Sequence, residues 1–286
     1  MIDLHVHSSH SDGTHKPEEL LRLAALQEIT LLALADHDCI SGVDEAIAAG
    51  NNLGIRVIPA VELSVAFERY TDVHLLAYGI NHLDPSFRER LSKFCARRDH
   101  RSEAIVERIN RKLHRQGRSA ISFAEVTALA DGAIGRPHIA RVLMEHGHVN
   151  SMEEAFNLYL IPCNVAKEYF PMDEAITEIH RLSGMAVLAH PTSITSDLPT
   201  LQRLICQLHG MGLDGVEAYS NMAGEAETAA LIGTARRLGM AVTGGSDFHG
   251  ITGDERLGII RGETEIPSVL GEELLAALVD RQHKPV

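Results

Sequence analysis

Short apolar runs alternate with longer amphipathic stretches along most of this chain. Brief runs rich in Val, Ile, Leu and Ala are typical of β-strands that are buried on both faces. We expect strands at residues 2–6, 31–35, 56–61, 73–79, 185–189, 215–218 and 240–243.

The stretches between these runs carry apolar residues at helical spacing, which predicts helices at residues 17–25, 43–53, 173–183, 198–211 and 225–238. Pro17 suits the first turn of a helix. Gly54, Gly184, Gly212 and Gly239 each follow a helical stretch and can end it. Strand, helix and strand in repeated order predict an α/β fold of parallel strands joined by crossover helices.

The alternation stops between residues 82 and 168, where the pattern is almost entirely helical. Helices are expected there at residues 85–117, 123–129, 137–145 and 152–160. Because the strand pattern resumes afterwards, we predict two units. Residues 1–81 and 169–286 form the α/β barrel domain, and residues 82–168 form an inserted helical subdomain.

Composition limits the partners and the compartment. The chain has 286 residues and a net charge of −13, which argues against a surface that coats nucleic acid. Its four cysteines are scattered, which favours free thiols in a reducing cytoplasm over a thiolate zinc site. No apolar run reaches the roughly 20 residues that span a bilayer, and no leader pattern opens the chain. We expect a cytoplasmic protein with no membrane contact and no obligate protein partner.

Residues of the type that bind metal ions recur beside the predicted strands. They form three compact strings, His5-Val6-His7, Asp36-His37-Asp38 and Ser246-Asp247-Phe248-His249. The complete candidate set is His5, His7, Asp12, His37, Glu62, His74, His190, Asp247 and His249.

One histidine beside an apolar run is most often a structural or solvated residue. In a barrel, however, the carboxyl ends of separate strands meet at one mouth, so a recurring set favours a shared site. Imidazole and carboxylate are ligands for zinc, manganese and iron. Glu62 lies in an otherwise apolar segment, where a carboxylate is costly without a cation. The pattern predicts a multinuclear metal hydrolase.

Three nearby acidic residues have two interpretations each. Asp36 and Asp38 flank His37 and either orient it or lie solvated in a turn. Glu217 ends the sixth apolar run and lies either at the rim near the metals or away from them.

These strings resemble the polymerase-and-histidinol-phosphatase (PHP) family of metal phosphoesterases. The matching segments are His5-Val6-His7-Ser8, Ser11-Asp12-Gly13, Ala35-Asp36-His37-Asp38, Val61-Glu62, Ala189-His190-Pro191 and Gly245-Ser246-Asp247-Phe248-His249. The resemblance implies a distorted seven-stranded (β/α)7 barrel that holds up to three divalent ions. We expect manganese, with iron or zinc as alternatives.

The resemblance also implies a distribution of ligands. His5, His7, Glu62 and Asp247 would hold one ion; Glu62 would bridge to a second held by His74 and His190; Asp12, His37 and His249 would hold the third. No side chain is expected to act as the nucleophile, because a metal-bound hydroxide fills that role.

The predicted insertion offers the sequence's only information on the substrate. Residues 88–118 contain eleven Arg or Lys and four acids, which indicates either a solvated helix face or a cationic wall that attracts a polyanion. Arg136 precedes a predicted helix start in Gly135-Arg136-Pro137-His138, a position suited to phosphate. We expect Arg136 and His138 to contact substrate.

This segment resembles the branch of nucleoside 3′,5′-bisphosphate phosphatases and 5′–3′ exoribonucleases. It implies a small phosphorylated nucleotide as substrate, with short 5′-phosphorylated RNA as a further one. Two alternatives stay open at this point. One is a histidinol phosphate phosphatase, and the other is a nucleic-acid-binding or regulatory module without activity.

Overall fold

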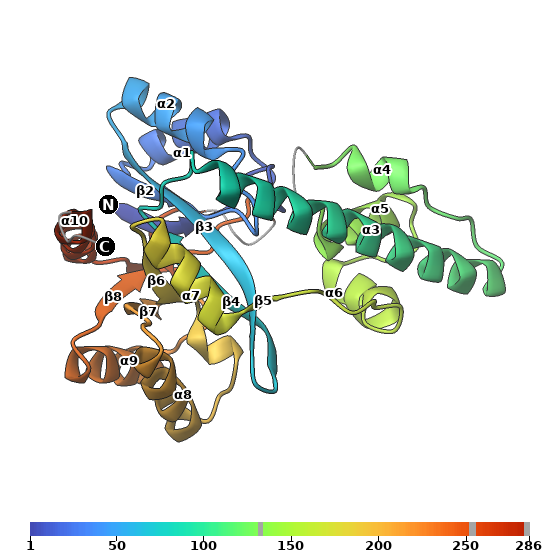
Figure 1. Cartoon of the computed structure of the whole chain (residues 1–286). Coiled ribbons are helices and arrows are strands. Elements are labelled where there is room, and N and C mark those ends of the chain that lie inside the picture. The colour runs from blue at the N-terminus through green and yellow to red at the C-terminus, as the bar shows by residue number, and fades with distance from the viewer. Residues whose placement is uncertain (131–133, 252–255, 283–286) are drawn as a thin grey trace.

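The computed structural model describes residues 1–130, 134–251 and 256–282. A central sheet is surrounded by helices, and helices α3 to α6 extend to one side of it (Figure 1). Among the described residues, none of the helices has both the length and the apolar composition needed to cross a bilayer.

The central sheet has the strand order β1-β2-β3-β4-β6-β7-β8, and the two-residue strand β5 (Phe170–Pro171) pairs with β3 at its side. The strand bounds are β1 Ile2–Val6, β2 Leu31–Leu34, β3 Arg56–Phe67, β4 Tyr70–Tyr78, β6 Met185–Leu188, β7 Gly215–Tyr219 and β8 Ala241–Gly244. Most neighbours pair in parallel, so the expected α/β class is confirmed.

The two ends of this strand order meet at one rim. The backbone N–H of Asp247 donates to the His5 carbonyl at 2.9 Å, and Val6 forms an isolated parallel bridge with Phe248. The segment after β8 therefore lies beside the end of β1, although these residues are far apart in the sequence.

Strand β4 departs from the expected parallel arrangement, because it pairs antiparallel with both β3 and β6. Only Glu68 and Arg69 separate β3 from β4. A connection this short makes a hairpin, since a parallel crossover needs a dozen or more residues. Glu68 has a φ of 52°, in the left-handed region that such tight turns use.

The expected helices around the sheet are present as α1 Pro17–Leu26, α2 Val43–Leu53, α7 Met172–Arg181, α8 Leu198–Gly210 and α9 Glu225–Arg237. A further helix, α10 (Ser268–Gln282), and a hairpin of β9 (Ile259–Ile260) and β10 (Thr264–Glu265) carry no sequence prediction. Helix α10 covers the sheet with Leu270, Leu274 and Leu278, which are buried in the main core.

The region predicted as an insertion forms α3 (Pro85–Arg115), α4 (Phe123–Thr127), α5 (Arg136–Glu145), α6 (Met152–Ala155) and a π-helical turn (Phe156–Leu160). Its residues 131–133 lie outside the described part. These helices enclose a hydrophobic cluster of their own, which includes Ile109, Leu113, Leu143 and Tyr159. A separate core of this kind is what a helical subdomain needs. Phe87 and Leu91, near the start of α3, pack into the main core instead, and the bounds 82–168 stay a prediction.

Candidate metal centre

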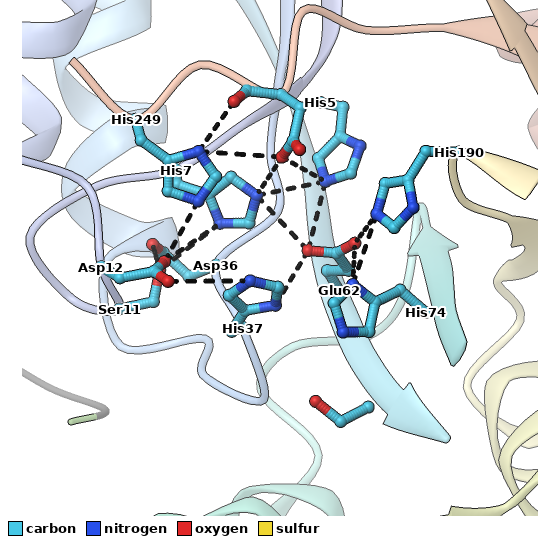
Figure 2. A network of polar contacts seen from close by, with 12 residues as sticks. His5, His7, Ser11, Asp12, Asp36, His37, Glu62, His74, His190 and His249 are labelled. Carbon is cyan, nitrogen blue, oxygen red and sulfur yellow. Dashed lines mark hydrogen bonds and ion pairs between the residues drawn. The ribbon is translucent and has the colours of Figure 1, made fainter. Parts of the chain in front are cut away.

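Nine metal-type side chains from separate elements converge at the rim where most strands end. Figure 2 shows the imidazole rings of His5, His7, His37, His74, His190 and His249 grouped around the carboxylates of Asp12 and Glu62. The backbone there is held in unusual conformations, because Asp38, His190 and Asp247 have φ values of 50°, 24° and 57°.

The hairpin explains how His74 reaches this rim from the start of its strand. Because β4 runs antiparallel, its first residues lie where the parallel strands end, and His74 lies opposite Ser64 of β3. Glu62 lies within β3 rather than beyond it, since β3 extends to Phe67. The predicted end of this strand at residue 61 is therefore wrong, whereas the predicted strand 73–79 already placed His74 near its start.

A first group of donor atoms surrounds His5 and His7. Their Nε2 atoms lie 3.1 Å apart, and His7 Nε2 is 3.0 Å from Asp247 Oδ1. Glu62 Oε2 lies 3.3 Å from His5 Nε2 and 3.4 Å from His7 Nε2. All four side chains aim at one point.

Glu62 connects this group to a second one through its other oxygen. Its Oε1 atom is 3.0 Å from both His74 Nδ1 and His190 Nε2, which lie 3.3 Å from each other. His37 Nδ1 is 2.9 Å from Glu62 Oε2, so His37 stands close to both groups.

A third group centres on Asp12, in the loop after β1. Asp12 Oδ1 is 3.3 Å from His249 Nε2, and Asp12 Oδ2 is 3.8 Å from His37 Nε2. His7 also faces it, since His7 Nδ1 lies 3.9 Å from Asp12 Oδ1. Asp12, His37 and His249 therefore come together, with His7 at their edge.

The spacing and chemistry of these donors fit divalent cations. Ligands about 2.1 Å from a tetrahedral ion lie about 3.4 Å from one another, close to the separations in the first group. Within the described residues, Asp12 Oδ1, His37 Nδ1 and Glu62 Oε2 are buried and form no hydrogen bond of good geometry, although each lies within 3.3 Å of another donor atom of the site. Buried polar atoms left this way are costly unless a cation takes their lone pairs.

The pKa shifts of the site residues also favour the binding of cations. Burial alone would raise the pKa of Glu62, but the facing His37, His74 and His5 hold it well below its usual range. Burial is likewise outweighed at His249, where Asp12 raises the pKa to about 10. The buried carboxylates of Glu62 and Asp12 thus create a negative field that holds positive charge.

Comparison with known proteins identifies the family. A model of the PHP domain matches residues 3–160. The chain is 34% identical over 260 residues to the 3′,5′-nucleoside bisphosphate phosphatase of Chromobacterium violaceum, and the aligned region covers 87% of each protein. It is 33% identical over 250 residues to the 5′-3′ exoribonuclease of Haemophilus influenzae, covering 86% of this chain and 89% of that one.

The chain belongs to the PHP domain family. Its fold matches the crystal structure of a candidate metal-dependent phosphoesterase from Bifidobacterium adolescentis with a TM-score of 0.82, at 26% identity and 96% coverage of both chains. The expected family and enzyme class, a metal-dependent phosphoesterase, are confirmed. This class works with divalent metal ions.

Further buried carboxylates lie next to the metal-type residues and hold the loops that carry them. Asp36 accepts hydrogen bonds from the Ser8 N–H at 2.8 Å and from the Ser8 and Ser11 hydroxyls, and so is not solvated. Asp38 accepts from the Ser64 N–H and hydroxyl at 2.7 and 2.8 Å. Both acids are buried and fix loops that carry metal-type residues, which excludes the solvated interpretation. An orienting effect on the His37 ring itself stays a prediction.

Glu217 lies directly beneath two of the histidines. Its Oε1 atom is 3.0 Å from His5 Nδ1, and its Oε2 atom accepts the backbone N–H of His190 at 2.7 Å. The interpretation of Glu217 as a residue near the metal rim is thus the one that the geometry supports.

Asp3 has no sequence prediction. It accepts the backbone N–H groups of His5, Ser246 and Gly258, and burial raises its pKa to about 6. The signal that could have identified it is a carboxylate inside an apolar run, as at Glu62.

Arg136 lies at the start of α5 and lines a cavity of about 130 Å³ beside the rim. The cavity is lined by Asp12, His37, Asp72, His74, Arg98, Arg101, Gly135, Arg136, Pro137, Phe156 and Lys167. His138 is fully buried, and its Nδ1 accepts the Gly135 N–H at 3.0 Å. This bond shapes the turn that presents Arg136, while direct phosphate contact by His138 stays a prediction.

The basic stretch on α3 is largely committed to contacts within the protein. Arg90 pairs with Glu174, Lys93 with Glu89 and Arg97 with Glu168, all at the surface. Arg98 instead points inward to Asp38 at 2.9 Å, and Arg98 and Arg101 line the cavity. The stretch therefore contributes two cations to the site rather than a continuous cationic wall.

Proposed function

We propose that this chain removes one phosphate from a nucleoside 3′,5′-bisphosphate, yielding a nucleoside 5′-monophosphate and inorganic phosphate. The observation that carries the proposal is the cationic cavity that adjoins the metal-type rim. A bisphosphate has one ester to be cleaved and a second anionic group to be held, and the site has a place for each. The name of the Chromobacterium violaceum relative supports this choice.

We propose three divalent ions, with manganese as the native metal. His5, His7, Glu62 and Asp247 would hold the first; Glu62, His74 and His190 the second; Asp12, His37 and His249 the third. The donor separations support the first and third groups, and the 3.0 to 3.3 Å separations among Glu62, His74 and His190 support the second. His37 also lies within reach of Glu62 and His74. Mixed imidazole and carboxylate ligands are compatible with manganese, iron and zinc.

When bound, such ions supply an activated water at neutral pH and neutralise charge on the phosphoryl group. The nine side chains hold these ions at fixed positions. These side chains lie on β1, β3 and β4 or in the segments that directly follow β1, β2, β6 and β8, so separate parts of one sheet position them.

Arg101, Arg136 and Lys167 would bind the second phosphate. Lys167 Nζ donates to Asp72 at 3.0 Å, and Arg136 lies 3.4 Å from the same carboxylate. Asp72 thereby holds two cations together at the cavity. A phosphate has more negative charge than one carboxylate, and the guanidinium forks match its oxygens.

The ion pairs at the cavity and along α3 also help to discriminate among the other candidate substrates. Histidinol phosphate needs a free carboxylate for its amine, whereas Asp72 is already paired with Lys167 and Arg136. A long RNA needs a cationic track, whereas much of α3 is paired internally. Short 5′-phosphorylated RNA stays a second candidate, because the Haemophilus influenzae relative is named as an exoribonuclease. We also propose a cytoplasmic location, which suits the unpaired cysteines.

The test is phosphate release with manganese, and after chelation, from a panel of five compounds. The panel contains adenosine 3′,5′-bisphosphate, 5′-AMP, 3′-AMP, a 5′-phosphorylated trinucleotide and histidinol phosphate. We expect the bisphosphate to have the highest kcat/KM and chelation to abolish turnover. A higher kcat/KM for histidinol phosphate, or equal values for 3′-AMP and the bisphosphate, would overturn the second-phosphate site.

A further inference from the structure

Two cysteines from different elements meet outside the metal rim. Cys39 is buried in the loop that follows β2, and Cys95 is half-buried on α3. The Cys95 thiol donates to the Asp38 carbonyl, which directly precedes Cys39, at 3.6 Å. This contact places the Cys95 thiol beside the peptide bond that joins Asp38 to Cys39. Neither has a part in the proposed hydrolysis.

Both thiols line one cavity of about 470 Å³ between α2 and α3. Ser41, Asp44, Arg88 and Ser92 add polar groups to its wall, and Cys39 Sγ lies 3.0 Å from Ser41 Oγ. A cavity of this size and polarity admits water and small polar oxidants to thiols that are otherwise shielded.

We propose that Cys39 and Cys95 form an oxidation-sensitive pair that a hydroperoxide converts into an intramolecular disulfide. The sulfur of one cysteine attacks a peroxide oxygen, the O–O bond breaks, and an alcohol or water leaves, giving a sulfenic acid. The second sulfur then displaces the sulfenic oxygen, which leaves as water with the thiol proton. Two thiols are oxidised by two electrons, and one peroxide is reduced.

The disulfide would act on the segment that carries His37. Arg98, one turn beyond Cys95, already ties α3 to this segment through the His37 carbonyl at 3.1 Å and the Asp38 carboxylate at 2.9 Å. A disulfide bond is about 2.05 Å long, so bonding draws Cys39 toward α3. His37 Nδ1 now lies 2.9 Å from Glu62 Oε2, and a displaced His37 leaves that donor group. Oxidation therefore lowers metal retention, and this consequence alone rests on the proposed function.

The test uses the full chain loaded with manganese and treated with hydrogen peroxide. Free thiols are alkylated, cross-linked peptides are identified by mass spectrometry, and bound manganese is measured after gel filtration. The variants are Cys95→Ser and, as a matched control, Cys206→Ser, which removes an exposed thiol on α8. Cys39→Ser gives a second route to the same answer if Cys95→Ser does not fold.

We expect wild type and Cys206→Ser to lose two alkylatable thiols and to yield a peptide joining Cys39 to Cys95. Dithiothreitol should restore both thiols. Bound manganese should fall at least twofold in these oxidised proteins and stay constant in Cys95→Ser. A protein in which Cys206 is oxidised before any Cys39–Cys95 peptide appears would overturn the proposal. A disulfide that leaves the manganese content unchanged would overturn its effect on the rim. Because peptide mapping needs no substrate, absence of phosphatase activity would count against the proposed function alone.

Discussion

Replacing Glu217 by Gln tests whether this buried carboxylate sets the tautomer of His5. Glu217 is fully buried and accepts two hydrogen bonds, from the His5 ring and from the backbone of His190. With Nδ1 carrying its proton toward Glu217, His5 Nε2 keeps its lone pair for the donor group at the rim. Glutamine has the same shape but only one acceptor oxygen.

Either orientation of the amide damages one ligand. If its oxygen stays on the His190 N–H, its NH2 group faces His5 Nδ1, and the proton moves to Nε2, where it blocks the ion. If the amide turns, two N–H donors oppose each other at His190, whose φ is already 24°. Losing such a partner weakens metal binding by about 10- to 100-fold, which corresponds to about 1.4 to 2.8 kcal/mol.

The assay is a titration of the ion-free protein with manganese, together with metal content by elemental analysis. Glu272→Gln, an exposed carboxylate on α10, is the matched control and should bind manganese as wild type does. Circular dichroism confirms that both variants are folded. If folded Glu217→Gln bound every ion with wild-type affinity, the tautomer argument would be refuted.

Three further predictions concern protons, substrate and the helical region. In the ion-free protein, burial is outweighed by Glu62 at His74 and by Asp12 at His249, so their pKa values rise to about 9 and about 10. Metal ions must displace these protons in order to bind. The apparent affinity for manganese should therefore rise between pH 6 and pH 9, by about tenfold per pH unit for each proton displaced. An affinity that does not change with pH would contradict this prediction. Arg136→Ala should raise KM for the bisphosphate by about 10- to 100-fold, because a charged hydrogen bond to the substrate is lost, and should change kcat less. Steady-state kinetics would check this, with the surface variant Arg203→Ala as the control. Leu143→Ala should destabilise the helical core by about 2–5 kcal/mol and increase amide exchange in residues 85–160 before the sheet, whereas a uniform increase would argue against a separate subdomain.

Much of the fold could be predicted from the sequence because its signals are local. Helix α2 occupies the predicted residues, with Gly54 in the left-handed conformation that ends a helix. The strands on either side were recognisable as continuous apolar runs, since both of their faces are covered. Metal-type residues near those runs could therefore be grouped before any distance was known.

The direction of β4 could not be read in the same way. An apolar run has the same pattern in either direction, and the expectation of parallel strands came from the helices around it. The information lay in the two-residue gap at Glu68 and Arg69, which was hidden because β3 extends six residues beyond its predicted end at Val61. Glu62 and His74 were assigned to the site despite this difference.

Long-range partners were the least predictable part of the site. Glu217 and His5 are joined by a bond between residues 212 positions apart, and Asp3 binds Ser246 across 243 positions. The periodicity of the sequence does not reveal such pairings, because Glu217 and Asp3 each look like a single carboxylate in an apolar strand. The only indication of a partner was the residue type, because a carboxylate is costly to bury without one.

The meeting of β1 with the segment after β8 has a consequence for how the molecule holds together. An ion shared by His5 and Asp247 would join the first strand to a segment that is synthesised about 240 residues later. This link could form only after the segment that carries Asp247 is available. Since an ion that binds only the folded state adds about 2.7 kcal/mol at a free concentration 100 times its Kd, scarcity of metal would loosen the entire sheet as well as halt turnover.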